Sequence, residues 1–90
     1  NSSRILNYSI EDLSIQKNKL LVKAPFAAKG FTVQIDTVLR NPRIIEKGEE
    51  KPVIRIKDKR ALSPGTYFID KNESVLCFDL VKGLNELLIS

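Results

Sequence analysis

A chain of 90 residues makes one small domain, which buries only about two thirds of its unfolded surface and leaves little interior for an enclosed active site. His, Met and Trp are absent, so the commonest general base, the commonest metal ligand and the strongest sugar-stacking ring are missing. The net charge is +4, and no apolar run approaches the roughly 18 residues of a membrane-spanning helix. These properties argue against an enzyme, and no motif in the chain specifies a metal or a cofactor.

Strand patterns dominate the first two thirds of the chain. Residues 1–13 fit an edge strand or a short helix, and their aromatic and β-branched side chains favour the strand. Residues 17–24 and 29–39 alternate between apolar and polar side chains, and the second alternation breaks near its end, which suggests a bulge or a change of face. Residues 51–58 repeat the pattern, and Ser-Pro-Gly at 63–65 then predicts a turn.

The last third predicts three further strands, at residues 66–70, 74–80 and 85–90. The connections at 71–73 and 81–84 have the length of hairpin loops. We therefore expect consecutive strands to be antiparallel neighbours, so that this part of the chain forms a meander.

Six or seven short strands separated by turns predict an all-β fold, a small antiparallel β-sandwich of the immunoglobulin-like type. A five-stranded OB-type barrel is the alternative. The N-terminal segment lacks the features of a signal peptide. We expect residues 1–90 to be a single domain, excised from a larger protein. The alternation predicts a core made of Phe31, Val33, Ile35, Ile54, Ile56, Leu76, Phe78, Leu87 and Ile89.

The excess positive charge lies in one segment, residues 40–60, which holds eight basic and four acidic side chains, whereas the rest of the chain is balanced. A concentration of this kind attracts an anionic partner such as nucleic acid, a membrane surface or an anionic polysaccharide. It is also typical of a solvated hairpin or of an edge strand protected by charge, and the acids in the segment favour that interpretation. The candidate ligand-binding residues are Arg40, Arg43, Lys57, Lys59, Arg60 and Tyr67.

Aromatic side chains are absent from the basic segment, which makes nucleic acid a less favoured partner, because base stacking needs exposed rings near the positive charge. Tyr67 and Phe68 are consecutive in one predicted strand and must face opposite ways. We expect Tyr67 to be a core or sheet-edge residue more often than a sugar platform.

The single cysteine, Cys77, has no disulfide partner in the chain, and its apolar neighbours predict an inert buried thiol. Three Asn-x-Ser matches begin at Asn1, Asn7 and Asn72, which is compatible with a secreted, glycosylated protein or with Asn and Ser sharing turn positions. Any two of the three carboxylates Asp36, Asp70 and Asp79 are candidates for an acid–base pair, but strand-end aspartates are usually turn caps or solvated.

The final strands carry a resemblance to a known class of domain. Leu62, Pro64, Gly65, Tyr67, Leu76, Phe78, Gly83, Asn85, Leu87 and Ile89 follow a pattern similar to the final strands of immunoglobulin-like modules in bacterial and viral surface proteins and multidomain carbohydrate-active enzymes. The resemblance covers about a third of the chain and implies architecture and a non-catalytic context, without assigning binding residues. The Cys, Trp and Cys core of antibody-type domains is absent.

The sequence thus predicts a non-catalytic structural or binding module of a larger surface, secreted or virion protein, located outside the cell or on a virion. Its expected partners are neighbouring domains, another protein or a polyanionic glycan. The alternative is a small OB-type nucleic-acid-binding domain that uses the basic segment.

Overall fold

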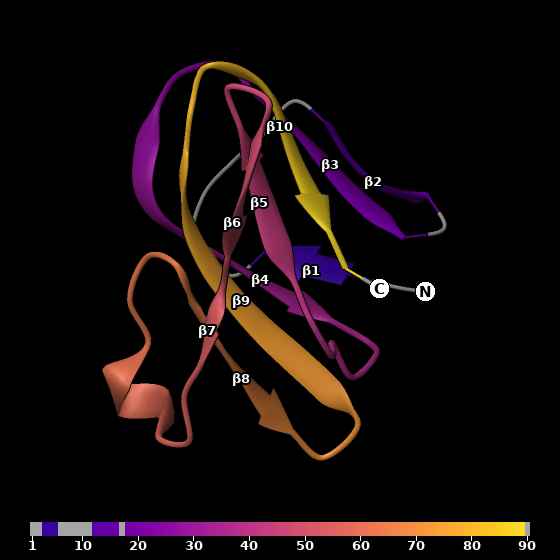
Figure 1. The fold of residues 1–90 in the computed structure, drawn as a ribbon, viewed down its shortest axis with the longest axis vertical. Coiled ribbons are helices and arrows are strands. Elements are labelled where there is room, and N and C mark those ends of the chain that lie inside the picture. Colours follow the sequence, from indigo (N-terminus) through magenta and orange to yellow (C-terminus); the bar gives the residue numbers. More distant parts are fainter. Residues whose placement is uncertain (1–2, 6–11, 17, 90) are drawn as a thin grey trace.

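The computed structural model describes residues 3–5, 12–16 and 18–89, which form two stacked β-sheets (Figure 1). The strands are β1 (Ser3–Ile5), β2 (Asp12–Gln16), β3 (Lys19–Ala24), β4 (Ala28–Ile35), β5 (Arg43–Glu46), β6 (Glu49–Pro52), β7 (Ile54–Arg55), β8 (Thr66–Asp70), β9 (Glu73–Leu80) and β10 (Gly83–Leu88). A short 3-10 helix, η1 (Lys59–Ala61), precedes β8, and these ranges contain no α-helix.

Sheet A has the strand order β1-β4-β9-β8-β7, and sheet B has the order β2-β3-β10-β5-β6. Neighbouring strands are antiparallel, except that β7 runs parallel to β8. The predicted all-β fold is confirmed, and two sheets around one core fit a β-sandwich. The described chain has ten strands where six or seven were expected, and its two sheets differ from the five-stranded barrel of the alternative.

Strict alternation builds the core of sheet A. Phe31, Val33 and Ile35 of β4 are fully buried, while the residues between them are half-buried. The ring of Phe31 meets that of Phe78 edge to face, with the ring centres 5.4 Å apart. The buried cluster consists of Leu20, Val22, Ala24, Phe31, Val33, Ile35, Leu39, Val53, Tyr67, Leu76, Phe78, Leu80, Leu87 and Ile89. Seven of the nine expected core residues belong to it.

Ile54 and Ile56, the other two, were assigned to the wrong face. The side chain of Ile54 is 58% exposed and that of Ile56 is half-buried, whereas Val53 is buried. The reason is that residues 51–58 are not one strand: β6 ends at Pro52, and the chain then crosses from sheet B to sheet A. Val53 fills the space between the sheets and donates its N–H to the carbonyl of Pro42 at 3.0 Å, so the next residue must point outward.

The start of the basic segment is a tight hairpin rather than a long loop. β5 and β6 pair from Arg43 opposite Pro52 to Glu46 opposite Glu49, which leaves two residues in the turn. Both turn residues, Lys47 and Gly48, have positive φ angles of 51° and 79°. Two positive φ angles are the requirement of a type I′ turn, whose twist matches that of the strands.

The second correction concerns residues 81–84, which were expected to form a hairpin loop. β8 and β9 form the expected hairpin, but β9 lies in sheet A and β10 lies in sheet B. The last three strands are therefore not a meander, because the chain passes from one sheet to the other after Leu80. The alternation breaks near residue 38 because β4 has already ended at Ile35. The register shift of β4 lies at the other end of the strand, between Ala28 and Phe31.

The predicted turn at 63–65 is confirmed. The N–H of Thr66 donates to the carbonyl of Ser63 at 3.0 Å, and Gly65 between them has a φ of 89°. Proline followed by a residue with positive φ is the pattern of a type II turn. The Thr66 hydroxyl accepts from the Ser63 N–H at 2.9 Å, which also ties the start of β8 to the turn.

Candidate functional site

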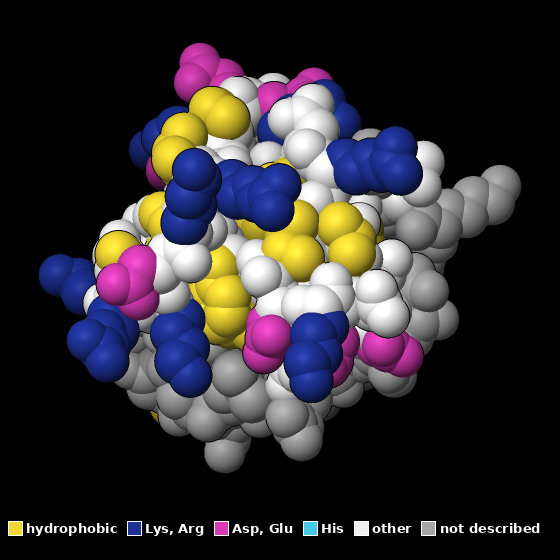
Figure 2. Space-filling model, turned by 90° about the horizontal axis from the view of Figure 1, so that it is seen from below, with side chains coloured by type: hydrophobic (Ala, Val, Ile, Leu, Met, Phe, Trp, Pro, Cys, Tyr) yellow, Lys and Arg dark blue, Asp and Glu magenta, His cyan; other side chains and the backbone are white. Residues whose placement is uncertain are grey.

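The basic segment supplies one edge strand of each sheet. β6 is the last strand of sheet B and is exposed along its whole length, and β7 is the last strand of sheet A. Both are short, and they carry charged side chains and a proline, the features by which native sheets discourage pairing with other chains. The end of the molecule seen from below carries many Lys and Arg side chains around a smaller group of hydrophobic ones (Figure 2).

Two of the predicted ligand-binding residues meet in a shallow groove beside η1. Lys57 and Lys59 line it from one side, with Asp58 between them in the chain, and Phe68, Ile69 and Asp70 of β8 complete it. We call it the Lys57 groove. Its two ammonium groups are both exposed, and the half-buried ring of Phe68 supplies an apolar surface. The combination suits a ligand that has an anionic group and a flat apolar face, although Asp70 and Asp58 moderate the positive charge.

Backbone pairing holds the groove together. The N–H of Ile56 donates to the carbonyl of Tyr67 at 2.8 Å, which fixes the segment after β7 against β8. The side chain of Asp58 then caps η1, because its Oδ1 accepts from the N–H of Arg60 at 2.9 Å. Lys57 and Lys59 therefore flank Asp58, the residue that caps η1, and do not lie on a free loop.

The other predicted ligand-binding residues are placed elsewhere. Arg40 is exposed before β5, and Arg43 lies in β5 with its guanidinium paired to the carboxylate of Glu50. Arg60 is exposed in η1 beside Lys59, but it does not line the groove. Tyr67 is only 4% exposed and belongs to the core, as its strand position suggested, so its ring offers no platform to a ligand.

Phe68 is the residue that sequence reasoning missed. The basic segment contains no aromatic side chain, and the parallel pairing of β7 with β8 brings one to it. The signal was present, because Tyr67 and Phe68 must face opposite ways and one of them had to be partly exposed. The pairing of β7 with β8 was not visible in the sequence.

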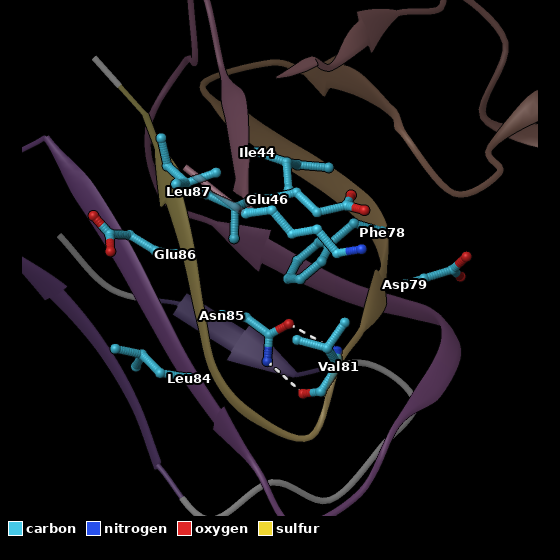
Figure 3. Close-up of a pocket in the computed structure, with 11 residues that line it drawn as sticks. Ile44, Glu46, Phe78, Asp79, Val81, Leu84, Asn85, Glu86 and Leu87 are labelled. Atoms are coloured by element: carbon cyan, nitrogen blue, oxygen red, sulfur yellow. Dashed lines mark hydrogen bonds between the residues drawn. The ribbon is translucent and has the colours of Figure 1, made fainter. Parts of the chain in front are cut away.

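A second hollow, of about 330 Å³, lies at the other end of the sandwich between β5, β9 and β10. Phe78 and Asn85 point into it, whereas Leu84 and Glu86 point to the other side of β10 (Figure 3). The Asn85 side chain is already committed: its Oδ1 accepts from the N–H of Val81 at 2.8 Å, and its Nδ2 donates to the carbonyls of Val81 and Val22 at 3.0 and 3.2 Å. This amide holds the crossing from β9 to β10 in place.

Cys77 is buried on the outer side of β9, where 4% of its surface is exposed. Burial raises the pKa of its thiol above the usual value, and the nearby charge of Asp79 raises it further, while a hydrogen bond with Thr32 acts in the opposite direction. A buried thiol with a raised pKa carries little thiolate at neutral pH, as expected for an inert residue.

The three candidate carboxylates have different surroundings. Asp79 accepts a hydrogen bond from the N–H of Gly30 at 2.9 Å and so holds the irregular start of β4, and Asp70 lines the Lys57 groove. Asp36 is exposed just after β4. Within residues 3–5, 12–16 and 18–89 the structure brings together no group of three side chains able to hold a metal ion, and no helix in these ranges is long and apolar enough to cross a membrane.

Of the three Asn-x-Ser matches, those at Asn1 and Asn7 lie outside the described residues. Asn72 is exposed in the turn between β8 and β9, as expected. Its partner Ser74 is fully buried, with its hydroxyl accepting from the N–H of Leu39 at 2.9 Å and donating to the carbonyl of Thr37 at 2.8 Å. Ser74 therefore has a structural role that is independent of any glycan.

Comparison with known proteins adds no relative to this picture. No protein-family model, no curated protein and no solved structure matches the chain.

Proposed function

We propose that this chain is a non-catalytic β-sandwich module of a larger surface, secreted or virion protein, with a structural, assembly or interaction role. The observation that carries the proposal is that several of its polar side chains form hydrogen bonds that hold the fold together. Asp79, Ser74 and Asn85 each bond the backbone of a distant segment at a corner of the sandwich. These groups shape the fold, and most of the charged side chains that remain exposed lie in turns, connections and the edge strands β6 and β7.

The finer fold assignment rests on the resemblance of the final strands. Immunoglobulin-like domains order their strands ABED and CFG, so that the last strand lies at a sheet edge. Here the last strand, β10, is the central strand of sheet B. We therefore propose the immunoglobulin-like relationship at the level of a two-sheet sandwich and not of strand order.

A second candidate function is the binding of an anionic glycan in the Lys57 groove. It is favoured by the presence of Phe68 beside Lys57 and Lys59, because the ring can pack on a sugar face while the ammonium groups pair with sulfate or carboxylate. Single-stranded nucleic acid would use the same chemistry, with a base on the ring and phosphates on the lysines. The two-sheet architecture lends no support to an OB-type nucleic-acid site.

Retention on immobilised heparin and on immobilised single-stranded DNA tests these candidates. The variant Lys57→Gln/Lys59→Gln removes two charges from the groove, and the matched control Lys47→Gln/Lys51→Gln removes two exposed charges from the β5–β6 hairpin. For a module without a polyanion site, both variants elute at the same lower salt concentration, because only net charge matters. A much larger loss in the groove variant, repeated in Phe68→Ala, would replace this conclusion with a specific anion site.

A further inference from the structure

Three of the most exposed hydrophobic side chains gather at one end of the sandwich. Among the side chains that the structure describes, the exposed large hydrophobics are Phe26 at 62%, Leu84 at 61%, Ile54 at 58%, Val81 at 52% and Val38 at 42%. Phe26 lies in the β3–β4 connection, and Val81 and Leu84 lie at the β9–β10 crossing. We call Phe26, Val81 and Leu84 the apolar tip.

Strand register places the two connections side by side. Ala24 pairs with Gly83 in sheet B, and Ala28 pairs with Leu80 in sheet A. The segments that these pairs enclose, residues 25–27 and 81–82, must therefore cross from one sheet to the other as neighbours. Isolated exposed hydrophobics are ordinary on a protein surface, but a group of them on adjacent loops marks an interaction site.

Lysines surround the apolar tip. Lys82 is in the β9–β10 crossing, Lys29 follows the β3–β4 connection, and Lys23 is paired in register with Leu84. All three are exposed. The two loops themselves contain no carboxylate.

The carboxylates that flank the tip are engaged elsewhere. Asp79 accepts from the N–H of Gly30, and Glu86 pairs with Lys19, the Nζ and Oε2 atoms being 2.9 Å apart. Glu46, which lines the nearby hollow, pairs with Lys51 at 3.4 Å. Asp79 keeps its negative charge, and Asp12 lies opposite Lys23 in register, so the positive charge at the tip itself is carried by Lys29 and Lys82. These two exposed lysines complement an anionic surface.

The apolar tip also lies away from both described ends of the chain. Ser3 pairs with Ile35, at the end of β4 that is remote from Ala28, and β10 runs away from the tip toward Leu88. The last described residue, Ile89, donates its N–H to the carbonyl of Asn18 beside the start of β3, so neither described end lies at the tip. The tip is thus placed to meet a separate surface rather than a covalently linked neighbour.

We propose that the apolar tip docks on an anionic lipid surface. Phe26 and Val81 enter the boundary between headgroups and acyl chains, and Lys29 and Lys82 pair with lipid phosphates or carboxylates. A second copy of the chain is a poorer occupant, because it would bring two sets of lysines together. This docking is independent of the Lys57 groove, which lies at the other end of β9, beside the turn where Asp70 pairs with Glu73.

Co-flotation with vesicles tests the proposal. The probes are vesicles of phosphatidylcholine alone and vesicles in which about one third of the lipid is phosphatidylserine. We expect the wild-type chain to float with the anionic vesicles and to be released by high salt, and Phe26→Ala/Val81→Ala to partition roughly tenfold or more weakly. The double variant Lys29→Gln/Lys82→Gln should lose its preference for anionic lipid.

Matched controls separate the tip from the rest of the surface. Ile54→Ala removes a hydrophobic side chain of similar exposure from β7, and Lys57→Gln/Lys59→Gln removes the same charge from the groove; both should float like the wild type. Cooperative unfolding at an unchanged temperature would show that the tip variants are folded. Failure of the wild type to float, or a loss caused only by the groove variant, would overturn the proposal, and in the second case the groove would bind the lipid instead. Tip-dependent binding to a protein without lipid binding would also overturn it.

Discussion

Two polar side chains are buried among the described residues, and both bond to the backbone. Ser74 is fully buried and bridges residues 37 and 39, and Asn85 is 7% exposed and bridges the β9–β10 crossing to β3. No buried side-chain nitrogen or oxygen in this part of the chain lacks a hydrogen-bond partner. Such complete pairing matters because an unpaired buried polar group costs about 1–3 kcal/mol.

Replacing Asn85 with Ala should therefore destabilise the fold by about 1–3 kcal/mol. The substitution removes the acceptor of the Val81 N–H and the donor to the carbonyls of Val81 and Val22. Denaturant unfolding measures the change. Asn72→Ala is the control, because Asn72 is exposed in a turn, and its effect should stay within about 0.5 kcal/mol. Equal effects of the two variants would show that the Asn85 amide does not hold the crossing.

Truncating Phe78 to Ala should cost about 3–5 kcal/mol, because the ring is 1% exposed and packs edge to face on Phe31. Phe26→Ala removes the same ring from a position that is 62% exposed and should change the unfolding free energy by less than about 0.5 kcal/mol. Chemical denaturation of the two variants makes the comparison. A loss below about 1 kcal/mol at Phe78 would mean that β9 presents its other face to the core.

The Cys77 thiol should resist labelling in the folded protein and react once the chain unfolds. Its burial both blocks the reagent and raises its pKa, so the reactive thiolate is scarce at neutral pH. Labelling rates measured with and without denaturant test this expectation. Rapid modification of the native chain would contradict the assigned position of Cys77.

At the scale of single elements, alternation predicted those strands whose two faces differ. β4 was correct because its apolar residues recur at every second position on the core side, whereas in β9 five consecutive residues, 74–78, are buried and the strand is indicated by its apolar content. The same rule failed at Ile54 and Ile56, where an intact alternation continues across a change of sheet and Val53 sets which side faces inward. Local patterning records the period of a strand, but it does not record which sheet the strand joins.

The basic segment shows the same contrast between what local patterning predicts and what strand pairing determines. Its position at an exposed edge was predicted from its charges, and β6 and β7 are edge strands. A hairpin was expected there as a long loop, but its two strands, β5 and β6, were missed, because β6 carries no apolar face that could reveal a strand. The proximity of Phe68 to Lys57 was also missed, because it depends on a parallel pairing between segments that adjoin the turn at 63–65.

Neutralising the basic edge should leave the fold intact. Changing two or three of Arg40, Lys57, Lys59 and Arg60 to Gln should alter the unfolding free energy by less than about 0.5 kcal/mol each, because these side chains are exposed. Arg43→Gln breaks a partly exposed pair with Glu50, which is worth about 1 kcal/mol at most, and a long hydrogen bond from Nε to the carbonyl of Asn41. Light scattering should also reveal more self-association if the charges protect the edge. Unfolding at much lower denaturant would instead assign these residues a structural role.

At the scale of the whole molecule, two crossings determine where the surfaces lie. The β3–β4 and β9–β10 connections pass between the sheets at one end and carry the apolar tip. The β8–β9 hairpin and η1 lie toward the other end and carry the Lys57 groove. The apolar tip therefore depends on β9 and β10 being in different sheets, which the hairpin length of their connection did not indicate, whereas the groove depends on the pairing of β7 with β8.

Nuclear Overhauser contacts between backbone protons test this central feature most directly. The account predicts cross-strand contacts that place β10 between its two partners in sheet B, from Leu87 to Leu20 and from Leu87 to Ile44, together with contacts from Leu76 of β9 to Val33 of β4. It predicts no ladder between β9 and β10. A continuous ladder that pairs residues 76–80 with residues 83–87 would restore the meander and contradict both the sandwich described here and the surfaces derived from it.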